Sequence, residues 1–349
     1  MRYAITPELA QRAKTTSALM TSDHLTPTVT VIIPAYTMKR WGLLSESVAS
    51  VEAQTQPPTE LILCIDHNDE LYDQAIREWE TRYSSGGFPI HVIANKYEQD
   101  PAGSNAHAKA HGAKRRFGAG WARNSAAEVA RGDVLAFLDD DAAADPDWLK
   151  FLLAPYEDPT AVAVGGAPLP AFETSRPAWF PPNFDWVFGC AYEGLPRELS
   201  PLGHLIGANM SVRRSVFETI GGFHSIDFDD LDLCMRVAAA FPQGVVLYEP
   251  NAIVHHYVPA ERVSWRYFWR RCFFVNREKV DAFTDMGSAA NIRAERAFVR
   301  RAVTTQVRRE VGHALQGQPI GLVRLGAMFV GIFMAAAGNL VGRIQLWRR

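Results

Sequence analysis

Short apolar runs alternate with helical segments through the first part of the chain, and each run stops at a polar residue or a proline. The apolar runs cover residues 29–33, 60–65, 90–94 and 134–138, with helical spacing at 43–54 and 121–130. This alternation is typical of a parallel β-sheet covered by helices on both faces. Because such sheets bind ligands where their strands end, we expect an α/β fold with its site at that edge.

Three consecutive aspartates, Asp139, Asp140 and Asp141, follow the fourth apolar run. Neighbouring carboxylates repel one another, and a divalent cation reverses that repulsion. The same residues also fit a solvated turn before a helix that starts near Pro146. Taken alone, the three aspartates leave a cation site and a turn equally open.

The charge of the chain is distributed unevenly. The net charge is −2, yet the part from Glu261 onwards holds 16 basic and 6 acidic residues. A basic end on an acidic body suggests an anionic surface, either lipid or nucleic acid. Residues 325–342 carry no charge and are flanked by arginines, which favours lipid. We therefore expect membrane contact and no nucleic-acid partner.

The uncharged run 325–342 has 18 residues, the short limit for a helix that spans a bilayer. Its glycines and alanines lower its hydrophobicity, so it can span, lie at the interface or pack within the protein. Gly338 and Gly342 form a GxxxG pair, which favours close helix contact. A helix rich in aromatic residues and arginine is predicted at 263–280, with the composition of interfacial and of ordinary amphipathic helices.

Other features narrow the class of protein. Four scattered cysteines without CxxC spacing indicate a reducing, cytoplasmic setting rather than a disulfide framework. Gly118 and Gly120 begin a GxG before a helix, but Arg123 stands where a dinucleotide fingerprint has its third glycine. A nucleotide would therefore be held by strand-end aspartates and a metal. Aromatic residues in the loop-rich stretch 172–201 fit either a substrate wall or ordinary packing.

Seven segments together resemble family 2 glycosyltransferases. In the first half they read VTVIIPAY at 29–36, ELILCID at 60–66, GWARN at 120–124 and GDVLAFLDDD at 132–141. In the second half they read GANMSVRR at 207–214, GGF at 221–223 and DDLDLCMR at 229–236. The resemblance covers about 29–277 in the family's order and spacing. It implies a GT-A fold, a Rossmann-like mixed sheet flanked by helices, and an inverting reaction that uses a nucleotide sugar.

The resemblance also suggests a domain organisation. We expect an N-terminal arm at 1–27 and a GT-A catalytic domain at 28–258, followed by basic aromatic helices and a hydrophobic, membrane-associated segment at 259–349. Within the catalytic domain, 28–145 would be the nucleotide-binding half and 146–258 the acceptor side.

The resemblance assigns nucleotide-sugar binding to residues at or near the strand ends: Pro34, Ala35, Tyr36, Asp66, Arg123, Asp139 and Asp140. The first three would border the base and ribose, with uridine diphosphate as the expected carrier. Asp66 would accept a hydrogen bond from the base, and Asp139 would lie near the ribose. The stretch 96–117 is longer than usual for the family and fits a lid or a solvated loop.

Two metal ligands are expected by resemblance. Asp141, the last residue of the DxD motif, would coordinate Mg2+ or Mn2+ bridging the diphosphate. His256, after a strand at 245–248 and a turn at Pro250, would be the second ligand, because neutral imidazole binds divalent cations. A structural histidine beside an apolar strand is the alternative for His256.

The expected catalytic base is Asp230, which would take the proton of the acceptor hydroxyl. Asp229 stands beside it where the family commonly has glutamate. The alternative role of this pair is to supply negative charge at a helix N-terminus.

The expected function is metal-dependent, inverting transfer of a sugar from a UDP-sugar to a hydroxyl of a glycan or lipid-linked saccharide. The setting would be cell-envelope or exopolysaccharide synthesis at the inner face of the cell membrane. A sugar-phosphate nucleotidyltransferase is the enzymatic alternative, but it would open with a glycine-rich basic loop where this chain has VIIPAY. A non-catalytic, membrane-bound scaffold that binds sugar nucleotides is the other, and intact Asp141 and Asp230 disfavour it.

Overall fold

The computed structural model describes residues 27–80, 86–97, 118–224, 228–284, 304 and 306–347. The predicted arm and nearly all of the predicted lid at 96–117 lie outside these residues. The described chain divides into two compact units. Of the described residues, the sheet unit holds those up to Pro168 together with Arg197–His256, and the helical unit holds Leu169–Pro196 and those from Tyr257 onwards.

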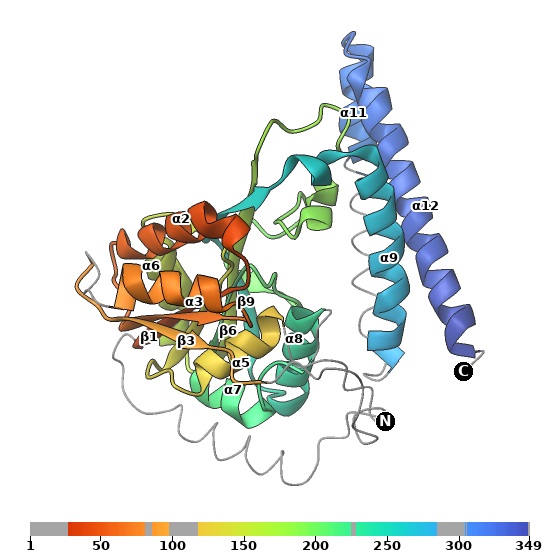
Figure 1. Ribbon diagram of the computed structural model, residues 1–349. Helices are drawn as coiled ribbons and strands as arrows, with labels where there is room; N and C mark the ends of the chain where they lie inside the picture. The colour runs from red at the N-terminus through yellow and green to blue at the C-terminus, as the bar shows by residue number, and fades with distance from the viewer. Residues whose placement is uncertain are drawn as a thin grey trace. The chain divides into compact units, whose positions relative to one another are not determined.

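Nine strands are present in the described ranges: β1 (Val29–Ala35), β2 (Glu60–Ile65), β3 (Ile90–Ala94), β4 (Val134–Leu138), β5 (Ala142–Ala144), β6 (Ala161–Phe172), β7 (Ser200–Pro201), β8 (Asn209–Arg213) and β9 (Val245–Val258). They form one sheet in the order β3-β2-β1-β4-β8-β6-β9-β5, with β7 on β9 (Figure 1). β1 to β4 pair in parallel, whereas β8 is antiparallel to β4 and β6. The expected α/β sheet is confirmed as a mixed sheet.

Helices cover both faces of this sheet (Figure 1). On one face lie α2 (Trp41–Glu52), α3 (Asp69–Ala75) and α6 (Trp148–Leu153), and on the other lie α5 (Ala119–Ala127), α7 (Arg214–Ile220) and α8 (Asp229–Ala240). Alternation along β1 accounts for two cores, because Val31 and Ile33 pack in the first and Ile32 in the second. Among the described residues, short 3-10 or π segments also occur at Met38–Arg40, Ile76–Glu80, Ala154–Glu157, Pro182–Phe188 and Ala260–Val263.

The predicted turn at Pro250 is wrong, because β9 continues through the proline to Val258. β7 pairs with the first part of β9 and β5 with its last part, so tertiary pairing holds the strand extended on both sides of Pro250. A proline has no N–H to offer a ladder, and here the next backbone N–H, that of Asn251, donates to the side chain of Glu249. This continuation sets where His256 lies.

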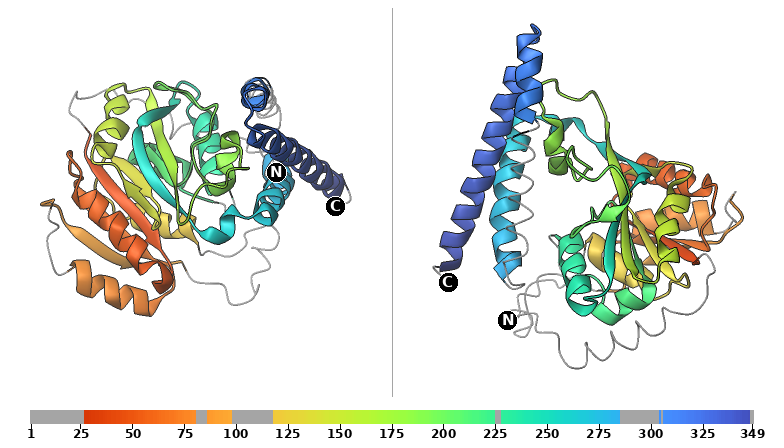
Figure 2. Two further views of the ribbon diagram at one scale, coloured as in Figure 1. Left: turned by 90° about the horizontal axis from the view of Figure 1, so that it is seen from above. Right: turned by 180° about the vertical axis from the view of Figure 1, so that it is seen from behind.

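The helical unit contains α9 (Trp265–Thr284), α11 (Val307–Leu315) and α12 (Ile320–Trp347). α9 and α12 lie side by side along their lengths (Figure 2). The aromatic rings of the loop-rich stretch pack with these helices; Phe180 stacks on Phe188 and contacts Phe268 edge-on. Of the two interpretations of this stretch, packing describes these rings. By length and composition alone, α12 could cross a membrane.

Candidate functional site

Asp66 begins the site at the carboxyl end of β2. Asn95 Nδ2 donates to its Oδ1 at 2.7 Å, and the backbone N–H of Gly118 donates to its Oδ2 at 2.8 Å. Gly118 has a φ of 100°, which a glycine adopts readily, and this turn into α5 brings its N–H to the carboxylate. Because Oδ2 accepts one hydrogen bond there, it keeps a lone pair for a ligand.

The end of β1 offers fewer side chains than the sequence suggests. Pro34 and Ala35 are buried within the strand, whereas Tyr36 is 55% exposed. The Arg40 guanidinium lies over the Tyr36 ring, 5.5 Å from its centroid. Of the three predicted positions at this strand end, only Tyr36 has an exposed side chain.

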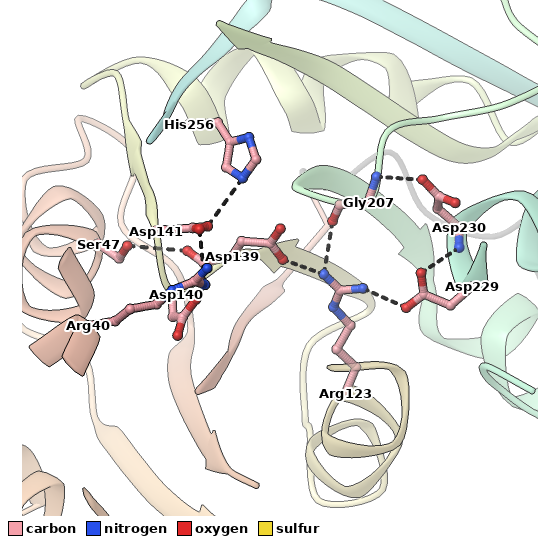
Figure 3. Close-up of polar contacts among 10 residues, drawn as sticks. All are labelled: Arg40, Ser47, Arg123, Asp139, Asp140, Asp141, Gly207, Asp229, Asp230 and His256. Atoms are coloured by element: carbon pink, nitrogen blue, oxygen red, sulfur yellow. Dashed lines mark hydrogen bonds and ion pairs between the residues drawn. The ribbon is translucent and has the colours of Figure 1, made fainter. Parts of the chain in front are cut away.

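Arg123 of α5 connects the two halves of the site (Figure 3). Its Nη2 donates to Oδ1 of Asp139 at 2.5 Å and its Nη1 donates to Oδ2 of Asp229 at 3.0 Å. The side chain is only 3% exposed, and its guanidinium lies near the rings of both Phe137 and Phe223, which also contact each other. A planar guanidinium can bind two carboxylates at once. Arg123 therefore joins an aspartate that follows β4 to an aspartate at the start of α8.

Asp230 lies at the start of α8, next to Asp229 (Figure 3). Its Oδ2 accepts the backbone N–H of Gly207 at 3.0 Å, and its Oδ1 accepts that of Leu231 at 2.7 Å. The carbonyl oxygen of Gly207 accepts from Arg123 Nη2 at 3.1 Å. Asp139, Arg123, Gly207 and Asp230 thus form a continuous set of polar contacts.

The residue before α8, Phe228, has a φ of 60°, in the left-handed region that bulky side chains rarely adopt. Such strain costs about 1 to 3 kcal/mol and persists where the surrounding structure imposes it. Here the strained residue immediately precedes the two carboxylates. The strain therefore sits at the point where the chain turns into α8 and presents them.

The two neighbouring carboxylates have pKa values displaced in opposite directions. Burial raises the pKa of Asp230, but His204 and the backbone N–H groups of Leu231 and Gly207 outweigh burial, so its pKa lies below the usual range. Burial raises the pKa of Asp229, and the charges of Asp230 and Asp139 raise it further against the pull of Arg123. The pair therefore favours an ionised Asp230, the form that a base requires.

Strand pairing brings His256 to the aspartates. In the ladder between β5 and β9, Ala142 pairs with His256 and Ala143 with His255. Successive side chains point to opposite faces, so buried His256 turns towards Asp141, with Nε2 3.2 Å from its Oδ1, while exposed His255 pairs with Asp145. Ser47 hydrogen-bonds the carbonyl oxygens of Asp139 and Ala142 and so holds the intervening turn.

Asp140 shares the guanidinium of Arg40 with Asp141. Arg40 Nη1 lies 2.8 Å from Oδ1 of Asp140 and 3.0 Å from Oδ2 of Asp141. The other oxygen of Asp140, Oδ2, is buried and has no hydrogen-bond partner. Burial and the two adjacent aspartates raise the pKa of Asp140 to about 7, against the lowering effect of Arg40. Asp140 and Asp141 thus concentrate negative charge that Arg40 only partly balances.

Asp139, Asp141 and His256 form a set that fits a metal ion. One potential ligand atom from each lies within 4.8 Å of the others. Carboxylate oxygens suit Mg2+ and Mn2+, and an imidazole nitrogen is a common ligand of transition metals. The buried, partnerless oxygen of Asp140 adds to the case for a cation, because it lies in the same turn. The residues present therefore fit a divalent cation.

The structure brings most predicted residues to one edge of the sheet and adds others. Asp139, Asp141 and His256 cluster, and Arg123 links them to Asp229 and Asp230. Sequence reasoning missed three contacts: Arg40 on the aspartate turn, His204 beside Asp230, and Asn95 on Asp66. Asn95 could have been found, because it ends β3 as Asp66 ends β2.

Comparisons with known proteins give a consistent result. The sequence profile described as Glycosyl transferase family 2 matches residues 110–221. A glucosyl-dolichyl phosphate glucuronosyltransferase of Haloferax volcanii is 30% identical over 261 residues, covering 72% of this chain and 76% of the relative. An O-antigen chain rhamnosyltransferase of Salmonella typhimurium is 32% identical over 163 residues, covering 44% and 51%.

Among solved structures, a mannosyltransferase of Pyrobaculum calidifontis in complex with GDP-Man and Mn2+ superimposes with a TM-score of 0.54 at 18% identity. The match covers 95% of this chain and 99% of that one. At this level of identity the likeness shows a shared fold, and it confirms the expected GT-A class.

Proposed function

Because the chain belongs to glycosyltransferase family 2, we propose that it transfers a sugar from a UDP-sugar to a hydroxyl of a glycan or lipid-linked saccharide, with inversion at the anomeric carbon. The carrying observation is the set of contacts from Asp139 through Arg123 to Asp229, beside Asp230. It supports a single site in which the residues assigned to the nucleotide lie close to the carboxylate assigned as the catalytic base.

The donor would lie along the strand ends. The free lone pair on Asp66 Oδ2 supports its role as acceptor for the imide N–H of uracil. Exposed Tyr36 would cover the base, with Pro34 and Ala35 shaping the floor. Asp139 would face the ribose, with Arg123 and Asp140 at the nucleotide; the buried guanidinium would orient Asp139 rather than leave it mobile.

Asp141 and His256, with Asp139 close by, would hold Mg2+ or Mn2+. When bound, the ion would neutralise charge that develops on the departing diphosphate. The mannosyltransferase from Pyrobaculum, described with GDP-Man and Mn2+, supports a metal and a nucleotide sugar as ligands of this fold. Arg40, which contacts Asp140 and Asp141, would stay beside the diphosphate as a second positive charge.

Asp230 would act as the base. The acceptor oxygen would attack the anomeric carbon from the face opposite the diphosphate, its proton would pass to Asp230, and the bond from the anomeric carbon to the diphosphate oxygen would break with its electron pair leaving on UDP. The hydrogen bonds that its two oxygens accept from the backbone N–H groups of Gly207 and Leu231 support this role, because they fix the orientation of the carboxylate. Attack from the opposite face gives inversion.

The acceptor class rests on the relatives and on the C-terminal helices. A relative named for glucosyl-dolichyl phosphate supports a lipid-linked saccharide, and a relative named for the O-antigen chain supports a cell-envelope glycan. The apolar helix α12 supports contact with a membrane, where such acceptors reside. We place this contact at the inner face of the cell membrane, where nucleotide sugars are made available by the cytoplasm.

The test measures UDP release from a panel of UDP-sugars with Mn2+ or Mg2+ and a lipid extract. Sugar-dependent release by the native chain, lost in Asp230→Asn and retained in Asp73→Asn, is the expected result. Asp73 is a matched control because it is exposed on α3. Release that persists at the native rate in Asp230→Asn would contradict the base assignment, and synthesis of UDP-sugar from UTP and sugar phosphate would contradict the reaction class.

A further inference from the structure

A glycine face of α12 packs directly on α9, and the two helices run parallel (Figure 2). A Cβ built on Gly338 would lie 2.1 Å from the carbonyl oxygen of Phe273, and one built on Gly342 would lie 2.6 Å from that of Arg277. These distances leave room for hydrogen alone, so the close approach depends on glycine. The GxxxG pair of the sequence is thus occupied within the chain by α9.

The opposite side of α12 is apolar and exposed. Six large apolar residues are exposed on this side, at sequence intervals of seven, four, seven, four and three: Leu322, Phe329, Phe333, Leu340, Ile344 and Trp347. Gly331, Gly338 and Gly342 have the same spacing on the other side of the helix. This apolar stripe, as we call those six residues, extends about 37 Å along the helix axis at 1.5 Å per residue.

The contact between α9 and α12 places arginines of α9 beside the uncharged run of α12. A Cβ on Gly331 would meet the ring of Phe268, and one on Gly342 would meet Val280. The intervening part of α9 carries Arg270, Arg271 and Arg277 and lies beside the uncharged run of α12. Arg270 and Arg271 are exposed and line an open cavity of about 420 Å3 with Tyr267 and Phe274.

A membrane-spanning α12 would carry those arginines into hydrocarbon. Charged side chains at that depth are costly, and the tight glycine contact leaves α12 no means of entering the bilayer without α9. A helix with one apolar side along its whole length instead fits the plane of the interface, where only that side is immersed. Length and composition permit crossing; the packing of α9 argues against it.

We infer that α12 lies flat on an anionic bilayer, with its apolar stripe at the boundary of the acyl chains and its axis parallel to the membrane. This rests on the membrane contact proposed above and specifies its geometry. Ile320–Trp347 contains no acidic residue and carries exposed Arg343, so its charge complements anionic lipid, whereas Arg324 pairs with Glu310 of α11. In a dimer formed through this stripe, two α12 helices would face each other, and neither has an acidic residue to pair with the arginine of the other.

Fluorescent labels on single introduced cysteines test this geometry in the full chain. Leu322→Cys, Phe333→Cys and Ile344→Cys sample the start, middle and end of the stripe, and native Cys64, Cys190, Cys234 and Cys272 are buried away from reagent. With phosphatidylglycerol vesicles, we expect equal, shallow depth at all three positions. We also expect an aqueous quencher added outside to reach the Leu322→Cys and Ile344→Cys labels equally.

A deep Phe333→Cys label between ends reached from opposite sides of the bilayer would overturn the inference in favour of a spanning helix. A label shielded without lipid, in a dimer of measured mass, would assign the stripe to a second copy and also overturn it. If the chain binds no vesicles, the membrane contact of the proposed function fails first, and the geometry fails with it.

Substitution in the stripe gives an independent measurement. Phe329→Ser combined with Phe333→Ser should weaken vesicle partition by about tenfold or more, because two large apolar side chains lose their burial in lipid. Leu315→Ser is the matched control, since Leu315 is 85% exposed on α11, outside the stripe. An equal loss in the control would show that the stripe is not the contact.

Discussion

The Nε2 atom of His204 lies 3.7 Å from Oδ2 of Asp230, at the carboxylate that we assign as the base. At this distance a protonated imidazole stabilises the ionised carboxylate and lowers the pKa of Asp230. The side chain of His204 is 43% exposed and that of Asp230 is 21% exposed. The ionisation of Asp230 therefore depends on His204, a residue that belongs to none of the sequence motifs.

His204→Gln should move the acid limb of the pH profile. A base works in its ionised form, so activity is retained above its pKa and falls as pH drops through it. Without His204 the pKa of Asp230 rises, and the fall in kcat/KM should begin at higher pH. Profiles of kcat/KM for the native chain and His204→Gln measure this, and superimposable acid limbs would show that His204 does not tune the base.

Asp230→Asn should leave donor binding nearly intact and remove transfer. The loss of general-base catalysis should lower kcat by about 10²- to 10⁴-fold. Titration of UDP by calorimetry and turnover by UDP release separate the two effects. A large loss of UDP affinity in this variant would place Asp230 in the donor site instead.

Asp141→Asn should weaken the metal-dependent part of donor binding. Loss of one of the three clustered ligand groups should raise the Mn2+ concentration needed for UDP binding by about 10- to 100-fold or more. Removal of metal with a chelator should weaken UDP binding to the native chain and change little in the variant. Asp147→Asn, on a half-exposed carboxylate before α6, is the control.

Arg123→Met should destabilise the sheet unit. Asp139 and Asp229 would lose their shared cation while staying partly buried, a change that costs about 3 kcal/mol or more in the free energy of unfolding. Lys150→Met removes an exposed pair with Asp147 and should cost less than about 1 kcal/mol. Denaturant unfolding compares them, and equal losses would mean that Arg123 is not a structural link.

Gly338→Ala should loosen the contact of α12 with α9. The added Cβ would collide with the backbone of α9, and overpacking of this kind costs about 1 to 3 kcal/mol. At Gly326 nothing lies within 4 Å, so Gly326→Ala should stabilise the helix by about 0.5 to 1 kcal/mol. Thermal unfolding that shifts equally and in one direction for both would contradict the packing.

Local pattern predicted the parallel strands well and the late strand poorly. β2, β3 and β4 have the expected bounds; β2 and β4 are fully buried runs, and β3 alternates buried with partly buried residues before its exposed last residue. β9 passes through Pro250, since pairing with β5 and β7 outweighs the local preference of proline. Partners distant along the chain decide that outcome, and sequence pattern does not show them.

The candidate site was predictable where residues end strands and unpredictable where side chains reach across. Asp66 and Asp139 follow strands, so their shared edge follows from topology. Arg40 and His204 reach the site from a short 3-10 segment and a loop, whose direction no periodicity sets. The prediction for His256 came from family resemblance, and its approach to Asp141 depends on a ladder with three alanines.

That three-alanine ladder has a consequence for how the chain can vary. Side chains of a strand alternate, so a shift of one position against β5 would exchange buried His256 for outward-facing His255. Replacing Ala143 by another small residue would leave the alternation unchanged, whereas deleting it would turn the imidazole away from Asp141. Related chains should accordingly tolerate substitutions between Asp141 and Asp145 but conserve the number of residues there.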